Sequence, residues 1–308
     1  MPNPWLERRV LAYAHQGGAR EAPSSTLYAI DQALAAGADA IELDVHATRD
    51  GELVVFHDDT LEQMTDGSGR IAEHDWAELE RLDNAFNFVP GKGAAPGGEG
   101  VLAYPLRGRA PADRSLRVVR LAEVLEAYPG VPLNLDVKES APAVPPYEEA
   151  LARLLGSHGR SDDVIVASFA DASTDAFREL APSVGTSPGA ALLGRAGMAL
   201  LAGRLPGEEV CAELRRHVAV QLPASYNGVE VVDEHLVGFA HDLGLAVHVW
   251  TVDDPAEMER LVALGVDGIM TDRPSVLAAV LARLGASWRR GDRANRHGPQ
   301  PAPIRRLD

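Results

Sequence analysis

Short apolar segments alternate with amphipathic segments along most of the chain, and this alternation constrains the fold more than any other feature. The apolar segments have the length and the Val, Ile and Leu content of buried strands. Strands are expected at residues 10–15, 40–46, 131–138, 164–169, 183–187, 218–222, 246–251 and 268–271. Helices are expected at residues 25–36, 120–128, 146–155, 172–180, 190–201, 233–243 and 255–264. This order predicts an α/β fold, a (β/α)8 TIM barrel, with functional residues at the carboxyl ends of the strands.

The expected strand at residues 40–46 has one apolar face and one face with ionisable side chains. Because side chains alternate along a strand, Glu42, Asp44 and His46 share one face, and the apolar residues between them share the other. Carboxylates at the end of a buried strand cost much free energy to desolvate unless a cation compensates them. A divalent metal ion is the usual partner, so the strand predicts a metal site.

A second strand, at residues 131–138, repeats this pattern. Asn134, Asp136 and Lys138 share a face, which adds a third carboxylate and a lysine. Three carboxylates and the lack of a cysteine beside them specify oxygen ligands, which suit Ca²⁺ or Mg²⁺ better than Zn²⁺. Lys138 would offer a positive charge to an anionic substrate.

Residues 53–57 form a further apolar segment that follows the second strand too closely for a parallel crossover. It must therefore return as an antiparallel hairpin after strand 2, with its turn near Asp50. This register brings His57 back opposite Leu43 and Asp44. A histidine is thereby expected beside the carboxylates.

The order of the motifs resembles that of the glycerophosphodiester phosphodiesterase family. The matching motifs are His-Gln-Gly-Gly at 15–18, Glu-Leu-Asp-Val at 42–45, Val-Val-Phe-His-Asp at 54–58, Leu-Asn-Leu-Asp-Val-Lys at 133–138, Val-Trp-Thr-Val at 249–252 and Gly-Val-Asp-Gly-Ile-Met-Thr-Asp at 265–272. The similarity extends over about residues 10–282. It implies a TIM barrel that holds one divalent cation, Ca²⁺ or Mg²⁺, and hydrolyses glycerophosphodiesters to glycerol 3-phosphate and an alcohol.

The resemblance assigns roles by motif. The metal carboxylates correspond to Glu42, Asp44 and Asp136, and the catalytic pair corresponds to His15 and His57. One histidine would activate the nucleophile and the other would protonate the leaving group, because an unperturbed imidazole titrates near neutrality. The nucleophile is water or the neighbouring glycerol hydroxyl, and the sequence leaves both open.

Three further residues are expected to bind substrate. Lys138 would neutralise the phosphate, and Trp250 would form a wall of the pocket by analogy with the family. Gln16 stands where the family commonly has arginine, so a neutral amide replaces a guanidinium beside the phosphate. Asp136 stands where glutamate is typical and reaches about one methylene less. Neither departure removes the metal carboxylates or the histidines.

Composition narrows the possible partners and location. The chain has 308 residues and a formal net charge of −16, which argues against nucleic acid and anionic membrane surfaces. The N-terminal residues contain no apolar run long enough for a signal peptide or a membrane span, so a cytoplasmic protein without stable membrane insertion is expected. Cys211 is the only cysteine, which excludes an intrachain disulfide. The expected partner is a small molecule, and the oligomeric state is not predicted.

The domain organisation is expected to be simple. Residues 1–284 would form the barrel domain, and residues 285–308 a polar, Arg-rich tail. A long irregular stretch at residues 84–118 interrupts the barrel after the hairpin, and such long loops are usually functional or mobile. We expect this insertion to cover part of the pocket and to tune the leaving group.

Two other functions compete with the hydrolysis of soluble glycerophosphodiesters. One is a lipid-directed phospholipase, of the lysophospholipase D or phosphatidylinositol-specific kind, which would need an exposed apolar rim. The insertion supplies only a few candidates for such a rim: Phe86, Phe88, Val89, Val101, Leu102 and Tyr104. The other is a non-catalytic phosphoester-binding protein, which only Gln16 favours.

Overall fold

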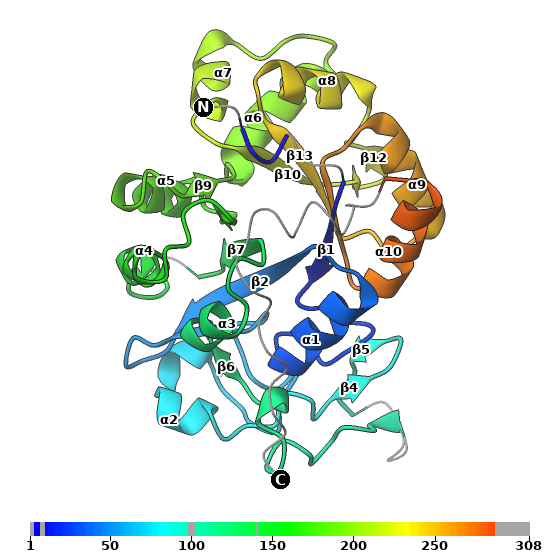
Figure 1. The fold of residues 1–308 in the computed structure, drawn as a ribbon. Coiled ribbons are helices and arrows are strands. Elements are labelled where there is room, and N and C mark those ends of the chain that lie inside the picture. The colour runs from blue at the N-terminus through cyan, green and yellow to red at the C-terminus, as the bar shows by residue number, and fades with distance from the viewer. Residues whose placement is uncertain (1–2, 7–9, 98–102, 140, 287–308) are drawn as a thin grey trace.

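Parallel strands form a nearly closed barrel in the computed structural model, which describes residues 3–6, 10–97, 103–139 and 141–286 (Figure 1). The strand order is β10-β13-β14-β1-β2-β7-β8-β9. These strands are β1 (Leu11–His15), β2 (Ala40–Ala47), β7 (Leu133–Val137), β8 (Val164–Ala167), β9 (Gly185–Thr186), β10 (Ala219–Pro223), β13 (Ala246–Trp250) and β14 (Gly268–Thr271). The two ends of this order meet where the Val218 N–H donates to Thr186 O at 3.0 Å. The predicted (β/α)8 barrel is confirmed.

Helices surround the barrel, and most of them lie where the sequence predicts them. They are α1 (Leu27–Ala36), α2 (Trp76–Leu79), α3 (Leu121–Ala127), α4 (Glu148–Ser157), α5 (Asp171–Leu180), α6 (Ala190–Leu201), α7 (Glu208–Leu214), α8 (Glu234–Asp242), α9 (Pro255–Leu264) and α10 (Pro274–Arg283). Three helices, α2, α7 and α10, were not predicted from the sequence. The first two are too short to show helical periodicity, whereas α10 begins at a proline, a residue favoured in the first turn of a helix.

The apolar faces of the strands and helices form the core outside the barrel. Leu43 on β2 and Leu135 on β7 are fully buried in one cluster with Ile30 of α1, Val124 of α3 and Leu151 of α4. Burial of a leucine side chain contributes about 1.5–3 kcal/mol. The predicted alternation thus sends apolar residues outward to the helices and polar residues into the barrel.

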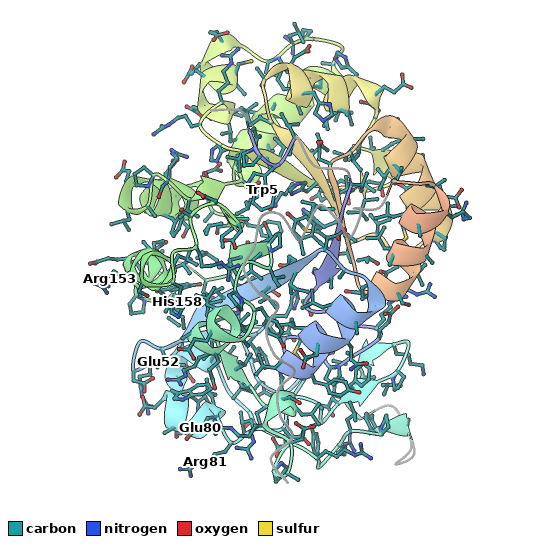
Figure 2. The ribbon with its side chains drawn as sticks, in the orientation of Figure 1. Trp5, Glu52, Glu80, Arg81, Arg153 and His158 are labelled. Carbon is teal, nitrogen blue, oxygen red and sulfur yellow. The ribbon has the colours of Figure 1, made fainter. Side chains whose placement is uncertain are left out.

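The amino-terminal end of the barrel is closed by residues that precede β1. Trp5 is 2% exposed and packs with Leu11, at the start of β1, inside the barrel (Figure 2). Asn3 Nδ2 donates to the main-chain oxygens of Val218 at 2.6 Å and Gly244 at 2.8 Å. Because this end is filled, the polar interior opens toward the carboxyl ends of the strands.

The predicted hairpin after strand 2 is present. Strand β3 (Leu53–Val55) runs antiparallel to β2 with Val55 opposite Val45, and the Phe56 N–H donates to Asp44 O at 3.1 Å. A short strand β6 (Val119–Arg120) pairs with the other edge of β3. This register returns the chain toward the carboxylates, as expected.

The insertion at residues 84–118 contains little regular structure in its described parts, 84–97 and 103–118. Its short elements are β4 (Phe88–Val89), β5 (Gly93–Ala94) and the 3₁₀ helix η3 (Arg114–Leu116). The Arg107 guanidinium lies over the rings of Phe86, at 4.3 Å, and Tyr104, at 3.6 Å. Asn84 Nδ2 donates to Ser24 O at 3.2 Å, which ties the insertion to the loop after β1.

The apolar side chains of the insertion that the structure describes do not form the exposed rim that a lipid-directed enzyme would need. Phe88, Val89 and Tyr104 are each about 95% buried. Val101 and Leu102 lie outside the described residues, as does the predicted tail from residue 287 onward. None of the helices that the structure describes has both the length and the apolarity needed to cross a membrane.

The other short elements that the structure describes come after β10 and after β3 in the chain. Strands β11 (Ser225–Tyr226) and β12 (Val229–Glu230) form a small hairpin after β10, and the 3₁₀ helix η1 (Ile71–Glu73) precedes α2. The hairpin side chains are exposed. These elements extend the carboxyl-terminal edge of the barrel without adding to its sheet.

Candidate active site

The strand registers bring the predicted carboxylates together inside the carboxyl end of the barrel. Asp44 on β2 lies directly opposite Asp136 on β7, and Glu42 lies opposite His15 on β1. Side chains opposite one another in neighbouring strands are close enough to interact. Acidic groups far apart in the sequence therefore share one site.

The three carboxylates are buried and repel one another. Glu42, Asp44 and Asp136 are 4%, 2% and 8% exposed. Burial and the neighbouring Asp44 carboxylate raise the pKa of Glu42 to about 8 and the pKa of Asp136 to about 7. Burial and repulsion thus favour the protonated forms of Glu42 and Asp136, because the site has too little positive charge for three ionised carboxylates.

Lys138 supplies part of the missing positive charge. Its Nζ lies 3.2 Å from Asp44 Oδ1 and 3.6 Å from Asp136 Oδ2. Burial opposes the charged ammonium, but Asp44 and Asp136 outweigh it and raise the pKa of Lys138. Asp44 Oδ2 is buried and has no hydrogen-bond partner among the described residues. A buried carboxylate oxygen without a partner is a strong sign of a bound cation.

His15, at the end of β1, is held by a carboxylate from the last strand of the barrel. Ala14 on β1 pairs with Thr271 on β14, so the residues that follow them, His15 and Asp272, are neighbours. The His15 Nδ1 lies 2.7 Å from Asp272 Oδ1, and its Nε2 lies 3.8 Å from Glu42 Oε2. Burial lowers the pKa of His15, but Glu42, Asp272 and Asp44 outweigh it and raise the pKa to about 9.

His57 is held in the same way by its neighbour in the sequence. Its Nδ1 lies 2.6 Å from Asp58 Oδ1. The His57 and His15 rings lie 6.3 Å apart, centroid to centroid, at an interplanar angle of 75°. Each Nδ1 faces an acceptor, which leaves each Nε2 available for proton exchange.

Gln16 contacts both His15 and Glu42. Its backbone N–H donates to Glu42 Oε2 at 3.1 Å, and its amide Nε2 lies 3.4 Å from His15 Nε2. Gly17 follows with a φ of +80°, and a Cβ there would lie 2.8 Å from the Cβ of Ala29. A glycine at this position therefore lets the turn after β1 pack closely on α1.

Trp250 lies at the end of β13 on the same edge of the barrel. Its ring lies 5.8 Å from that of Phe169, edge to face, and Phe169 follows β8. The Phe169 side chain is 61% exposed, although it is a large aromatic residue. The two rings offer an apolar surface at the carboxyl-terminal edge of the barrel. This surface is separate from the cluster of carboxylates.

Two residues of the site were missed in the sequence. Neither Asp272 nor Asp58 was assigned a role in the site from the sequence, but each binds a candidate catalytic histidine. One pair could have been predicted locally, because His57 and Asp58 are adjacent in the sequence. The other pair follows only from the closure of the barrel, which places β14 next to β1.

Comparisons with known proteins agree on one family. Residues 15–276 match the sequence profile of the glycerophosphoryl diester phosphodiesterase family. The chain is 30% identical over 279 residues to the glycerophosphodiester phosphodiesterase of Bacillus subtilis, which covers 88% of this chain and 86% of that protein. It is 29% identical to the enzyme of the same name from Caldanaerobacter subterraneus, over 90% of this chain and all of that protein.

The fold agrees as well. The crystal structure of a glycerophosphodiester phosphodiesterase from Agrobacterium tumefaciens aligns with a TM-score of 0.64 and 24% identity. The alignment covers 88% of this chain and 99% of that one. At this level of identity the likeness supports the fold alone.

Proposed function

Since the chain belongs to the glycerophosphoryl diester phosphodiesterase family and is therefore a phosphoric diester hydrolase, we propose that it hydrolyses glycerophosphodiesters to glycerol 3-phosphate and an alcohol. The observation that carries the proposal is the convergence of three buried carboxylates with two carboxylate-bound histidines. The carboxylates can hold a cation that would offset the negative charge of a phosphodiester, and the histidines can move protons on both sides of it. Members of this family are generally metal-dependent.

We propose that Glu42, Asp44 and Asp136 hold the divalent cation. Two observations fit this assignment: Asp44 Oδ2 lacks a hydrogen-bond partner among the described residues, and burial together with the neighbouring Asp44 carboxylate raises the pKa values of Glu42 and Asp136. Oxygen ligands alone favour Ca²⁺ or Mg²⁺. When bound, such an ion supplies positive charge that stabilises the negative charge on the phosphoryl oxygens.

The two histidines are proposed to divide the acid and base roles. With Nδ1 bonded to a carboxylate, His15 and His57 each present Nε2 for proton transfer. Their rings are 6.3 Å apart, so a phosphodiester between them could be deprotonated at the nucleophile and protonated at the leaving oxygen. The nucleophile is water or the neighbouring glycerol hydroxyl. A substrate that lacks the neighbouring glycerol hydroxyl distinguishes them, because only the second route needs that hydroxyl to form a cyclic phosphate, which water then opens.

Substrate contacts are proposed for three further residues. Lys138 brings a positive charge to the phosphate, and Gln16 brings an amide donor beside His15. Trp250 forms an apolar wall together with Phe169. Residues 1–284 would act as one catalytic domain, with the insertion at 84–118 next to the pocket.

The test is release of glycerol 3-phosphate from a panel of glycerophosphodiesters with different alcohols. We expect release with added Ca²⁺ or Mg²⁺ and none after chelation. A protein that binds the substrates but releases no product would be the non-catalytic binder considered above. Release from lysophospholipids alone would favour the lipid-directed alternative, for which the buried side chains of the insertion give no support.

A further inference from the structure

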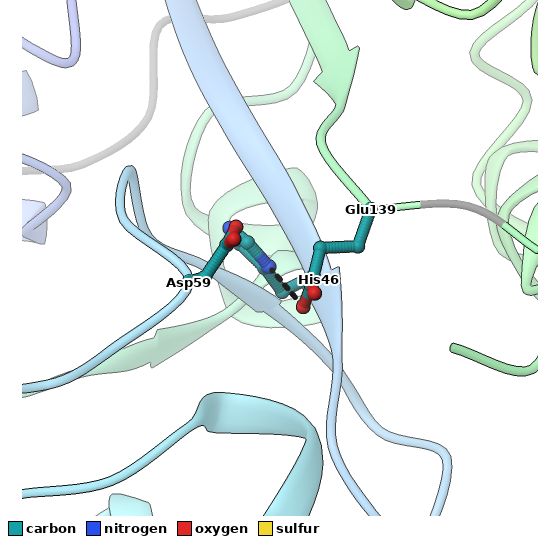
Figure 3. A group of neighbouring side chains, drawn as sticks. All are labelled: His46, Asp59 and Glu139. Atoms are coloured by element: carbon teal, nitrogen blue, oxygen red, sulfur yellow. Dashed lines mark ion pairs between the residues drawn. The ribbon is translucent and has the colours of Figure 1, made fainter. Parts of the chain in front are cut away.

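A second group of ligand-type side chains lies beside the candidate active site. His46 extends from β2, Glu139 follows β7, and Asp59 follows the hairpin strand β3 (Figure 3). One ligand atom from each of the three residues lies within 4.8 Å of the others. None of the three belongs to the carboxylate cluster of Glu42.

The two ring nitrogens of His46 face different groups, the main-chain oxygen of His57 and the carboxylate of Glu139. His46 Nε2 lies 3.5 Å from the main-chain oxygen of His57, which can only accept a hydrogen bond. The neutral ring therefore carries its proton on Nε2 and a lone pair on Nδ1. That Nδ1 lies 3.5 Å from Glu139 Oε2 and makes no hydrogen bond within the part of the chain that the structure describes.

Two acceptors that face one another in a buried place repel each other unless a proton or a metal cation lies between them. His46 is 1% exposed and Glu139 is 8% exposed, so bulk water cannot easily solvate either group. Arg70 pairs with Glu139 Oε1 and leaves Oε2 on the side of His46. Asp59 is exposed and adds a second carboxylate together with a path from solvent.

We propose that His46, Asp59 and Glu139 bind a transition-metal ion of the Zn²⁺ type, at a site separate from the catalytic carboxylates. One imidazole nitrogen and two carboxylate oxygens suit Zn²⁺, whereas Ca²⁺ and Mg²⁺ prefer oxygen ligands alone. The ion would link β2, the end of β7 and the loop that carries His57. The proposal does not depend on the phosphodiesterase activity.

Zn²⁺ binding to the full-length, metal-stripped protein tests this assignment. Calorimetry with excess Ca²⁺ present keeps the oxygen-only site filled, and metal analysis after dialysis counts the bound zinc. We expect the wild type to retain one equivalent of Zn²⁺ that His46→Gln and Asp59→Asn both lose. Asp59 is exposed, so its variant gives a result even if His46→Gln does not fold.

Two control variants locate the zinc. His241 also pairs with a carboxylate, Asp267, at 2.8 Å, and His241→Gln should keep the zinc equivalent if binding is specific to the proposed site. Asp44→Asn should also keep it, while Ca²⁺ binding is lost. Loss of zinc in Asp44→Asn would place the ion in the catalytic cluster, and equal zinc in the wild type, His46→Gln and Asp59→Asn would overturn the proposal.

Discussion

The two candidate catalytic histidines have the same hydrogen-bond arrangement but obtain it in different ways. His57 bonds to Asp58, the next residue, whereas His15 bonds to Asp272, which lies 257 residues away. The His15 pair is also less exposed: its two side chains are each 20% exposed, against 36% and 31% for His57 and Asp58. One pair is built by local sequence and the other by closure of the barrel.

This difference gives the two histidines different surroundings. His15 lies among Glu42, Asp44 and Asp272, which raise its pKa to about 9. His57 lies at the end of a hairpin, on a loop that solvent reaches. The same local hydrogen-bond geometry is thus combined with different charged neighbours, and we expect the two sides to differ in function as well.

The largest effect is expected from removing either imidazole. His15→Ala and His57→Ala should each lower kcat by about 10²–10⁴-fold, the usual contribution of a general acid or base. Turnover of diesters with an alkyl alcohol and with a nitrophenol leaving group checks this, because a good leaving group needs no proton. The variant that lacks the acid should recover on the nitrophenol ester. A folded variant with near wild-type kcat would remove that histidine from the mechanism.

The carboxylate partners should have smaller and unequal effects. We expect Asp272→Asn to lower kcat by roughly 10–100-fold, as seen for carboxylates that orient functional histidines, and Asp58→Asn to lower it less. The reason is that water can replace the more exposed Asp58, whereas the Asp272 N–H is fixed by Asp253 Oδ1 at 2.9 Å. The kcat, KM and pH profiles of both variants test this difference. An equal loss of kcat in the two variants would show that Asp272 matters no more to catalysis than Asp58.

Gln16 touches the His15 side only, so its replacement should act on that side. Gln16→Arg places a charge where the amide lies 3.4 Å from His15 Nε2. We expect KM to fall by roughly tenfold, since a charge-assisted hydrogen bond to phosphate is worth about 1.5 kcal/mol or more. Gln16→Met, which has similar length and no donor, is the control and should raise KM. An unchanged KM in both variants would show that residue 16 does not meet the phosphate.

The smallest effect concerns stability without metal. The pKa of His15 rises from 6.5 to about 9 on folding, so its contribution is complete below pH 6.5 and is lost as pH rises through 9. The pKa of Glu42 rises from 4.5 to about 8 on folding. Between these two pH values the folded state holds a proton that the unfolded state has released, so stability again falls as pH rises. With chelator, Tm should drop from pH 5 to pH 8 by at least about 2–4 °C, the shift produced by about 1 kcal/mol.

Two additions to this measurement identify the groups responsible. Ca²⁺ should remove most of the drop in Tm, because a bound cation replaces the protons that the carboxylates hold. Glu42→Gln should flatten the pH dependence in the presence of chelator. A Tm that rises between pH 5 and pH 8 in the chelated wild type would contradict the pKa values of the His15 side.

Sequence patterns alone were enough to predict the barrel, the hairpin and the carboxylate face of β2. Alternation with a period of two fixes which side chains share a face, and the short connection near Asp50 excludes a parallel crossover. Both rules act over a few residues, so they can be read without tertiary structure. The predicted positions of Glu42, Asp44, Asp136 and His57 follow from them.

Contacts between groups that are distant in the sequence depend on the tertiary structure. The pairing of β14 with β1 brings Asp272 to His15, and the ends of β2, β3 and β7 bring His46, Asp59 and Glu139 together. These contacts depend on strand register and barrel closure, which no local pattern encodes. The burial that raises the pKa values of Glu42 and Asp136 likewise arises only when the whole barrel excludes water.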